Sequence, residues 1–244
     1  PLILEPWQCW LFTTLYGWVG ADNMRRFRIA LWLIPRKNGK SSLAAVVALY
    51  MLVADGESGA EVYSAATSRD QAKTIAEIAW EMARRSPSFR EYFGVRMGSE
   101  TTKSLFVPAN GSKFAALSAD AHSLDGLNVS CALIDELGQH KRAAVWNVRD
   151  TATGARPQPM IQAVTTAGVD VGGVCHQKLA YLEKILDGVF VDEQFFGVNY
   201  TIDPGDAIAD PIIQRKANPN YGVSVDPADL MRKVLAAQHS TSEM

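Results

Sequence analysis

The distribution of apolar positions predicts a strand, a loop and a helix near the start of the chain. Residues 28–34 (RIALWLI) form a short, continuous apolar run, which is typical of a strand buried on both faces of a parallel sheet. After the loop at 35–39, the segment from Lys40 onward is rich in alanine and leucine and ends in Asp55-Gly56, as expected for a buried helix with a glycine stop.

The same alternation continues along the chain. Four more short segments have strand-like apolar patterns: 61–66, 129–134, 160–164 and 194–200. Ser68 is a candidate N-cap for a helix with helically spaced apolar residues that ends before Pro87. Around Asn110-Gly111, two strand patterns predict a hairpin whose turn takes its positive φ angles from these two residues.

Strands that alternate with helices predict an α/β fold with a mostly parallel, doubly wound sheet flanked by helices. Beyond residue 172 come a helix pattern (175–186), one strand pattern and a tail rich in proline, asparagine and aspartate. We therefore expect two units: a core domain over 1–172 and a small lid-like subdomain over 173–244.

Composition narrows the functional class. The chain has 244 residues, 48% of them hydrophobic and 20% charged, which is ordinary for a folded enzyme and excludes disorder. Its apolar runs are shorter than a membrane span and its start lacks a signal-peptide pattern, so we expect a cytosolic protein without a membrane partner. The net charge of −2 excludes a wholly basic nucleic-acid coat, but the basic residues crowded into 25–40 indicate a local polyanion site.

The loop after the first strand has the composition of a phosphate-binding loop. Its residues are Pro35, Arg36, Lys37, Asn38, Gly39, Lys40, Ser41 and Ser42. A strand–loop–helix context directs backbone N–H groups and a helix N-terminus at phosphate, Lys40 reaches the β- and γ-phosphates, and the Ser41 hydroxyl suits Mg²⁺. The motif is incomplete, because Ile34 stands where the strict pattern requires glycine.

An acidic pair, Asp135-Glu136, follows the apolar strand at 129–134. In a parallel sheet the carboxyl end of this strand faces the same crevice as the loop. Asp135 is then placed to hold Mg²⁺ and Glu136 to polarise the attacking water as a general base. The alternative is that the two acids only cap a following helix.

Several further motifs, taken together with these, resemble the large terminase family of tailed phages. They are the Pro6-Trp7-Gln8 triplet, Arg36 in the loop, the segment 123–128 (SLDGLN), the segment 134–137 (IDEL), the segment 165–168 (TTAG), and the segment 216–220 (KANPN). The likeness extends over essentially the whole chain.

This resemblance implies an ASCE-type P-loop ATPase that uses ATP and Mg²⁺ to drive double-stranded viral DNA into the procapsid. It assigns Trp7 and Gln8 to adenine, Lys40, Arg36 and Glu136 to catalysis, the loop 35–42 to the phosphates, Ser41 and Asp135 to the metal, and Thr165 and Thr166 to coupling. A buried structural role for the Trp-Gln pair, and ordinary strand-end hydrogen bonding for the threonines, are the alternatives.

The partners implied by the resemblance are the portal protein, the terminase small subunit and further copies in a ring, in the host cytoplasm and transiently at the procapsid portal. A neighbour's arginine completes many such sites, and Arg142, Arg149 and Arg156 are candidates for it. The family's nuclease domain is expected beyond this chain. A helicase-like P-loop translocase and a non-hydrolysing, nucleotide-dependent assembly module remain alternative functions.

Overall fold

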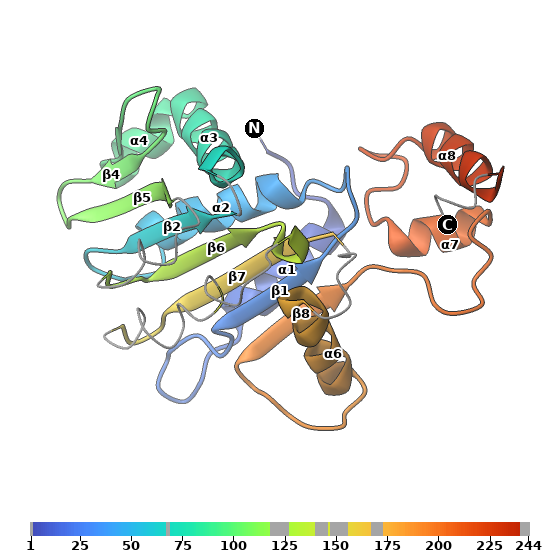
Figure 1. The fold of residues 1–244 in the computed structure, drawn as a ribbon. Helices are drawn as coiled ribbons and strands as arrows, with labels where there is room; N and C mark the ends of the chain where they lie inside the picture. The colour runs from blue at the N-terminus through green and yellow to red at the C-terminus, as the bar shows by residue number, and fades with distance from the viewer. Residues whose placement is uncertain are drawn as a thin grey trace.

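The strands of the described residues form one eight-stranded sheet, in the order β3-β4-β5-β2-β6-β7-β1-β8 (Figure 1). The computed structural model describes residues 2–66, 69–117, 127–139, 146, 156–166 and 173–239. The strands are β1 Ile29–Leu33, β2 Glu61–Ala65, β3 Arg96–Met97, β4 Leu105–Val107, β5 Ser112–Leu117, β6 Cys131–Asp135, β7 Met160–Thr165 and β8 Phe195–Asn199.

The six strands from β5 to β8 in this order pair in parallel, and only β3 and β4 run antiparallel to their neighbours. The predicted α/β class with a mostly parallel sheet is therefore confirmed. The central strands β1, β6 and β7 are buried at every position, because helices cover both faces. This is why their sequences are continuous apolar runs and lack the alternation of a half-exposed strand.

The helices are α1 Pro6–Gly17, α2 Lys40–Val53, α3 Arg69–Arg85, α4 Pro87–Phe93, the short 3-10 helix η2 Leu137–Gln139, α6 Val174–Leu186, α7 Pro211–Ala217 and α8 Pro227–His239. Side chains of β1 divide between the two faces of the sheet. Ala30 and Trp32 join the core with α1, α2 and α3, whereas Ile29 and Leu31 join the core with α6. This is the alternation that a strand imposes on its side chains.

The hairpin predicted around Asn110-Gly111 is present as β4 and β5. Only Gly111 has a positive φ (74°), so the expectation that both turn residues supply one is corrected. Asn110 instead accepts a hydrogen bond from the backbone N–H of Ser112 (3.0 Å) through its side chain, a local turn contact that asparagine often makes. The predicted cap at Ser68 lies outside the described residues.

The C-terminal part contributes to the central sheet. β8 pairs in parallel with β1 over five residue pairs. Val174 and Leu182 of α6 pack in the same core as Ile29 and Leu31, on one face of the sheet. Residues 173–199 thus share the core with the segments before them. Of the helices described after β7, α6 lies close to the sheet in Figure 1, whereas α7 and α8 stand to one side of it. In the part of the chain that the structure describes, no helix combines the length and apolar character that a membrane crossing requires.

Candidate functional site

The sheet order brings three chain segments to one edge. β1, β7 and β6 are parallel neighbours, with β7 in the middle. The register pairs Leu33 with Thr165 and Asp135 with Val164, so the three strands end nearly level. The loop 35–39, Thr166 and the acidic pair therefore lie together at the carboxyl edge, where ligands bind in open α/β sheets.

The loop has an unusual backbone. Lys37 (φ 70°) and Gly39 (φ 78°) both lie in the left-handed region, which a lysine adopts only at a cost of about 1–3 kcal/mol. Gly39 is also the N-cap of α2, and no side chain caps that helix. The first N–H groups of α2 are therefore free of a side-chain cap, which makes the helix start suitable for an anion.

Lys40 begins α2 and reaches the acidic pair. Its Nζ lies 3.0 Å from Oε1 of Glu136, and the two side chains are 11% and 23% exposed. Thr166 Oγ1 donates to the other carboxylate oxygen, Oε2, at 3.3 Å. Glu136 itself has a left-handed backbone (φ 49°). The structure therefore brings three of the predicted site residues into direct contact across β7.

Asp135 is buried at the end of β6 and accepts a hydrogen bond from the Glu136 N–H (2.9 Å). Its pKa is raised above the usual range, chiefly because burial disfavours the charged carboxylate and secondly because Glu136 is adjacent. The Glu136 N–H and the Lys40 ammonium act in the opposite direction. The neighbourhood thus combines hard oxygen donors with a cation on the facing helix.

The two threonines differ in their contacts. Thr165 is fully buried and accepts from the Gly138 N–H (3.0 Å), while its hydroxyl donates to the Thr166 carbonyl oxygen (2.8 Å). It therefore ties the η2 turn to β7, as ordinary strand-end hydrogen bonding would. Of the two threonines, it is Thr166 that bonds to the Glu136 carboxylate. The remainder of the predicted coupling motif, 167–168, lies outside the described residues.

Trp7 and Gln8 lie behind the loop on α1. Gln8 is buried and its Oε1 accepts from the Glu5 N–H (3.0 Å), closing the N-terminal capping box of α1. Its Nε2 lies 3.9 Å from the position that a Cβ on Gly39 would occupy. Trp7 Nε1 donates to Oδ1 of Asn220 at 2.7 Å. Both side chains have protein partners, and a role in binding adenine stays a prediction.

A cavity of about 950 Å³ adjoins the loop on the side of β8 and α8. Its walls include Arg36, Thr166, Tyr200, Asn218 and Asp229. Lys40 and Glu136 are not among its lining residues, so the cavity is an extension beside the Lys40 contact and not its centre. Of the five residues just named, the sequence analysis had not singled out Tyr200 and Asp229. Only the position of Tyr200, an aromatic at the end of a predicted strand, gave a signal for it.

Arg36 and Lys37 are exposed at the top of the loop, and Ser41 and Ser42 are half-buried in the first turn of α2. Ser41 comes directly after Lys40, at the same helix start. The loop thus joins the end of β1 to the start of α2, and its role in binding phosphate stays a prediction.

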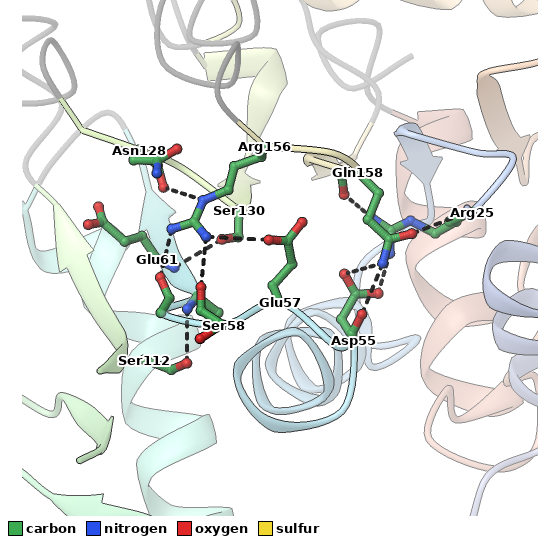
Figure 2. Close-up of polar contacts among 12 residues, drawn as sticks. Arg25, Asp55, Glu57, Ser58, Glu61, Ser112, Asn128, Ser130, Arg156 and Gln158 are labelled. Atoms are coloured by element: carbon green, nitrogen blue, oxygen red, sulfur yellow. Dashed lines mark hydrogen bonds and ion pairs between the residues drawn. The ribbon is translucent and has the colours of Figure 1, made fainter. Parts of the chain in front are cut away.

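Arg156 is not available to a neighbouring molecule (Figure 2). Its guanidinium donates to the carbonyl oxygens of Asn128, Ser58 and Gly59 at 2.6–3.1 Å and pairs with Glu57 at 3.3 Å. The Arg156 side chain is only 9% exposed. Of the three candidates for a neighbour's arginine, Arg156 is therefore disfavoured, because its charge is paired within its own chain. Arg142 and Arg149 lie outside the described residues.

Comparison with known proteins agrees with this geometry. The sequence model described as "Terminase large subunit, ATPase domain" matches residues 6–184. Protein YmfN of Escherichia coli (strain K12) is 42% identical over 101 residues, which are 41% of this chain and 22% of YmfN. The large terminase subunit of Enterobacteria phage HK97 is 30% identical over 169 residues, 68% of this chain and 32% of that protein.

Solved structures show the same fold. The crystal structure of the HK97 large terminase superposes with a TM-score of 0.83 at 23% identity, covering 99% of this chain and 48% of that one. The large terminase of a thermophilic bacteriophage, solved in complex with ADP, gives 0.57 at 12% identity, covering 82% and 46%. The chain thus spans less than half the length of each of these relatives.

Proposed function

Since the chain belongs to the family of terminase large-subunit ATPase domains, we propose that it binds ATP over the loop 35–42 and hydrolyses it. One observation carries the proposal: the 3.0 Å contact between Lys40 and Glu136 across β7. Transfer of a phosphoryl group to water needs a cation for the phosphate and a base for the water, both close to the reacting atoms. Lys40 at the uncapped start of α2 and Glu136 after β6, on the other side of β7, are two such groups.

In this proposal Lys40 moves from Glu136 to the β- and γ-phosphates when ATP binds. Glu136, released from the ion pair and still hydrogen-bonded to Thr166, accepts a proton from the attacking water. Arg36, exposed on the loop, neutralises charge that develops on the γ-phosphate. Thr166 senses loss of that phosphate through its bond to Glu136, while Thr165 fixes the strand end.

The donor set fits Mg²⁺, because Asp135 supplies a carboxylate and Ser41 a hydroxyl, both oxygen ligands of the kind this ion prefers. When bound, the ion would neutralise phosphate charge. The cavity beside the loop is large enough for a nucleoside, and we assign base and ribose to it, with Tyr200 at its wall. Trp7 and Gln8 are not among the residues that line this cavity, but the Trp7 ring packs on the lining residue Tyr200 with ring centroids 5.6 Å apart. A role for Trp7 and Gln8 in adenine binding is therefore proposed to act from behind this wall.

The biological role proposed for the whole protein is translocation of double-stranded viral DNA into the procapsid. Its proposed partners are the portal protein, the terminase small subunit and further copies in a ring, and a nuclease domain is proposed beyond this chain. Because α6 and β8 share the core, the lid-like subdomain expected over 173–244 is proposed to consist of the residues after β8. A helicase-like translocase and a non-hydrolysing assembly module are the alternatives. Measured ATP turnover would exclude the non-hydrolysing module.

The test is steady-state ATP hydrolysis by the wild-type chain and by Lys40→Ala, with Lys184→Ala as the matched control because Lys184 is exposed on α6. We expect turnover to vanish only in the Lys40 variant. Native-rate hydrolysis by Lys40→Ala would overturn the assignment of the loop.

The isolated domain is proposed to be a monomer with slow turnover, because a neighbour's arginine contributes about 10³-fold or more in related motors. ATPase assays over a range of protein concentrations, with sedimentation of the same samples, test this. Fast turnover from a species that sediments as a monomer would instead favour a complete site within one chain.

A further inference from the structure

The interior of the phosphate loop is held by a side chain of the loop itself. Asn38 is fully buried, and its Nδ2 donates to the carbonyl oxygens of Pro35 (3.2 Å) and Arg36 (3.1 Å). These contacts turn two loop carbonyls toward Asn38. An anion site built from backbone needs N–H groups on its concave side and carbonyls directed away from it, so Asn38 supports the conformation that binds phosphate.

The same carboxamide is held by residues about 180 positions later in the chain. Asn38 Nδ2 also donates to Oδ1 of Asn218 (3.1 Å), and Asn38 Oδ1 accepts from the Asn220 N–H (2.9 Å). Asn218 and Asn220 are buried. The oxygen of the Asn38 amide is therefore satisfied by the C-terminal segment, and its nitrogen bonds both to the loop and to that segment.

Two more contacts fasten this segment around the loop. The Ser224 hydroxyl donates to the carbonyl oxygen of Lys37, the left-handed loop residue. Asn220 Nδ2 donates to Ser224 Oγ (3.0 Å), and its Oδ1 accepts from Trp7 on α1 (2.7 Å). The segment 218–225 thus braces the loop at Lys37 and Asn38 and is itself fixed to α1.

The segment also forms one wall of the cavity beside the loop, through Asn218, Ser224 and Val225. A nucleotide that extends from the loop into this cavity touches both the loop and its brace. If the segment undocks, Asn38 Oδ1 loses its donor, the Asn220 N–H, and Nδ2 keeps only the carbonyl oxygens of Pro35 and Arg36. Because a buried amide oxygen without a donor is unfavourable, the loop conformation and the docking of the segment favour each other.

We propose that Asn38 is the positioning residue through which the segment 218–225 sets the conformation of the phosphate loop, so that docking of this segment and nucleotide binding reinforce each other. The inference rests on the proposed function for its nucleotide half only. Segment docking and ligand affinity are then linked reciprocally: each changes the other by the same factor.

The test uses Asn218→Ala, which removes the one Asn38 acceptor that the segment 218–225 provides and lies outside the loop. The matched control is Gln214→Leu. Gln214 is equally buried on α7, and its side chain contacts the Ile208 carbonyl oxygen and Met231 but not the loop. In nucleotide-free protein, we expect amide hydrogen exchange at residues 36–41 to rise about tenfold in Asn218→Ala and to stay unchanged in Gln214→Leu.

The second measurement is binding of ADP with Mg²⁺ by calorimetry. We expect affinity to fall about tenfold in Asn218→Ala and to be native in the control. In the wild type, Mg-ADP should slow exchange of the amides at 218–225. If the variant does not fold, this wild-type protection decides alone, and its absence would overturn the proposal.

The two proposals fail in different ways. A wild-type chain that binds no Mg-ADP would sink the proposed function, while exchange at residues 36–41 would still decide whether the segment sets the loop. Native affinity and native loop exchange in a folded Asn218→Ala variant would sink the coupling and leave nucleotide binding intact.

Discussion

Glu136 shows how much a single residue is constrained at this edge of the sheet. It adopts a left-handed backbone (φ 49°), and its carboxylate contacts both Lys40 and Thr166. Left-handed residues other than glycine persist where surrounding contacts hold them, and they cluster at functional sites. In the proposed function, a phosphate has to displace Glu136 from its ion pair with Lys40.

Glu136→Gln should therefore separate binding from chemistry. Removing the charge frees Lys40 for phosphate, so we expect affinity for Mg-ADP to be native or tighter. Turnover should fall by about 10²-fold or more, because a general base typically contributes that much. Calorimetry and phosphate release measure the two quantities. Weaker binding without a specific loss of turnover would exchange the roles of Glu136 and Asp135.

A second group of buried charges lies at the opposite edge, around Arg25 and Asp55 (Figure 2). Arg25 pairs with Asp55 and donates to the carbonyl oxygens of Phe27 (3.0 Å) and Gln158 (2.6 Å). Burial raises the pKa of Asp55 to about 6, whereas Arg25 acts to lower it. The cost of burying the Asp55 carboxylate thus exceeds the stabilisation that it gains from the Arg25 charge, as happens for many buried ion pairs.

This raised pKa gives a signed pH prediction. Between about pH 4 and 6 the folded protein holds the Asp55 proton more tightly than the unfolded chain, so the contribution of Asp55 to the free energy of unfolding falls as pH rises. We expect the wild type to lose about 2 kcal/mol of unfolding free energy relative to Asp55→Asn between pH 4 and pH 7. Urea unfolding of both proteins at each pH measures this quantity. A wild type that instead gains stability relative to the variant as pH rises would mean that the Arg25 attraction dominates.

At the scale of elements, the edge strand β8 is joined to the sheet by a close approach of helix α6. A Cβ on Gly197 would lie 2.6 Å from Leu182 Cδ1 and 3.0 Å from the Leu31 carbonyl oxygen. Leu182 belongs to α6 and is buried in the core between this helix and the sheet. Glycine at this position thus permits α6 to pack directly on β8.

Gly197→Ala should lower the free energy of unfolding by about 1–3 kcal/mol, because the packed leucine and the strand backbone leave no room for a methyl group. Gly17→Ala is the control, since a Cβ at the end of α1 meets nothing within 4 Å. Chemical denaturation of both variants checks this. Equal stability of the two would show that α6 shifts without penalty.

At the scale of the whole molecule, the two edges of the sheet have separate tasks. The carboxyl edge gathers the loop, the acidic pair and Thr166, while the amino edge holds the buried pairs of Arg25 and Arg156. Strands of five or six residues separate these edges by about 17–20 Å. Arg156 therefore stabilises the fold at a distance from the loop 35–42 of its own chain.

Arg156→Ala should destabilise the chain by about 3 kcal/mol, because it leaves Glu57, whose side chain is 6% exposed, without its cation. Turnover per folded molecule should not change. Thermal unfolding and ATP hydrolysis below the melting range test both parts. A folded variant that loses turnover would restore the idea that Arg156 acts on a neighbour.

The sequence alone predicted the elements whose buried positions form a continuous apolar run or a helical pattern. The strands β1, β2, β6, β7 and β8 and the helices α2 and α6 follow from apolar runs and helical spacing, and the loop at Lys40 and the acids at 135–136 follow from their places after such strands. A strand covered on both faces has to be apolar throughout, so its sequence identifies it without knowledge of its partners.

The tertiary structure alone decided which elements meet. Neither the insertion of β7 between β1 and β6, nor the pairing of β8 with β1, nor the use of Arg156 within its own chain has a local signal, because strand order and long-range pairing depend on the whole core. The contact of Asn38 with Asn218 joins residues 180 positions apart. Apolar periodicity reports which face of an element is buried, but a hydrogen bond between two distant amides depends on where folding brings their backbones.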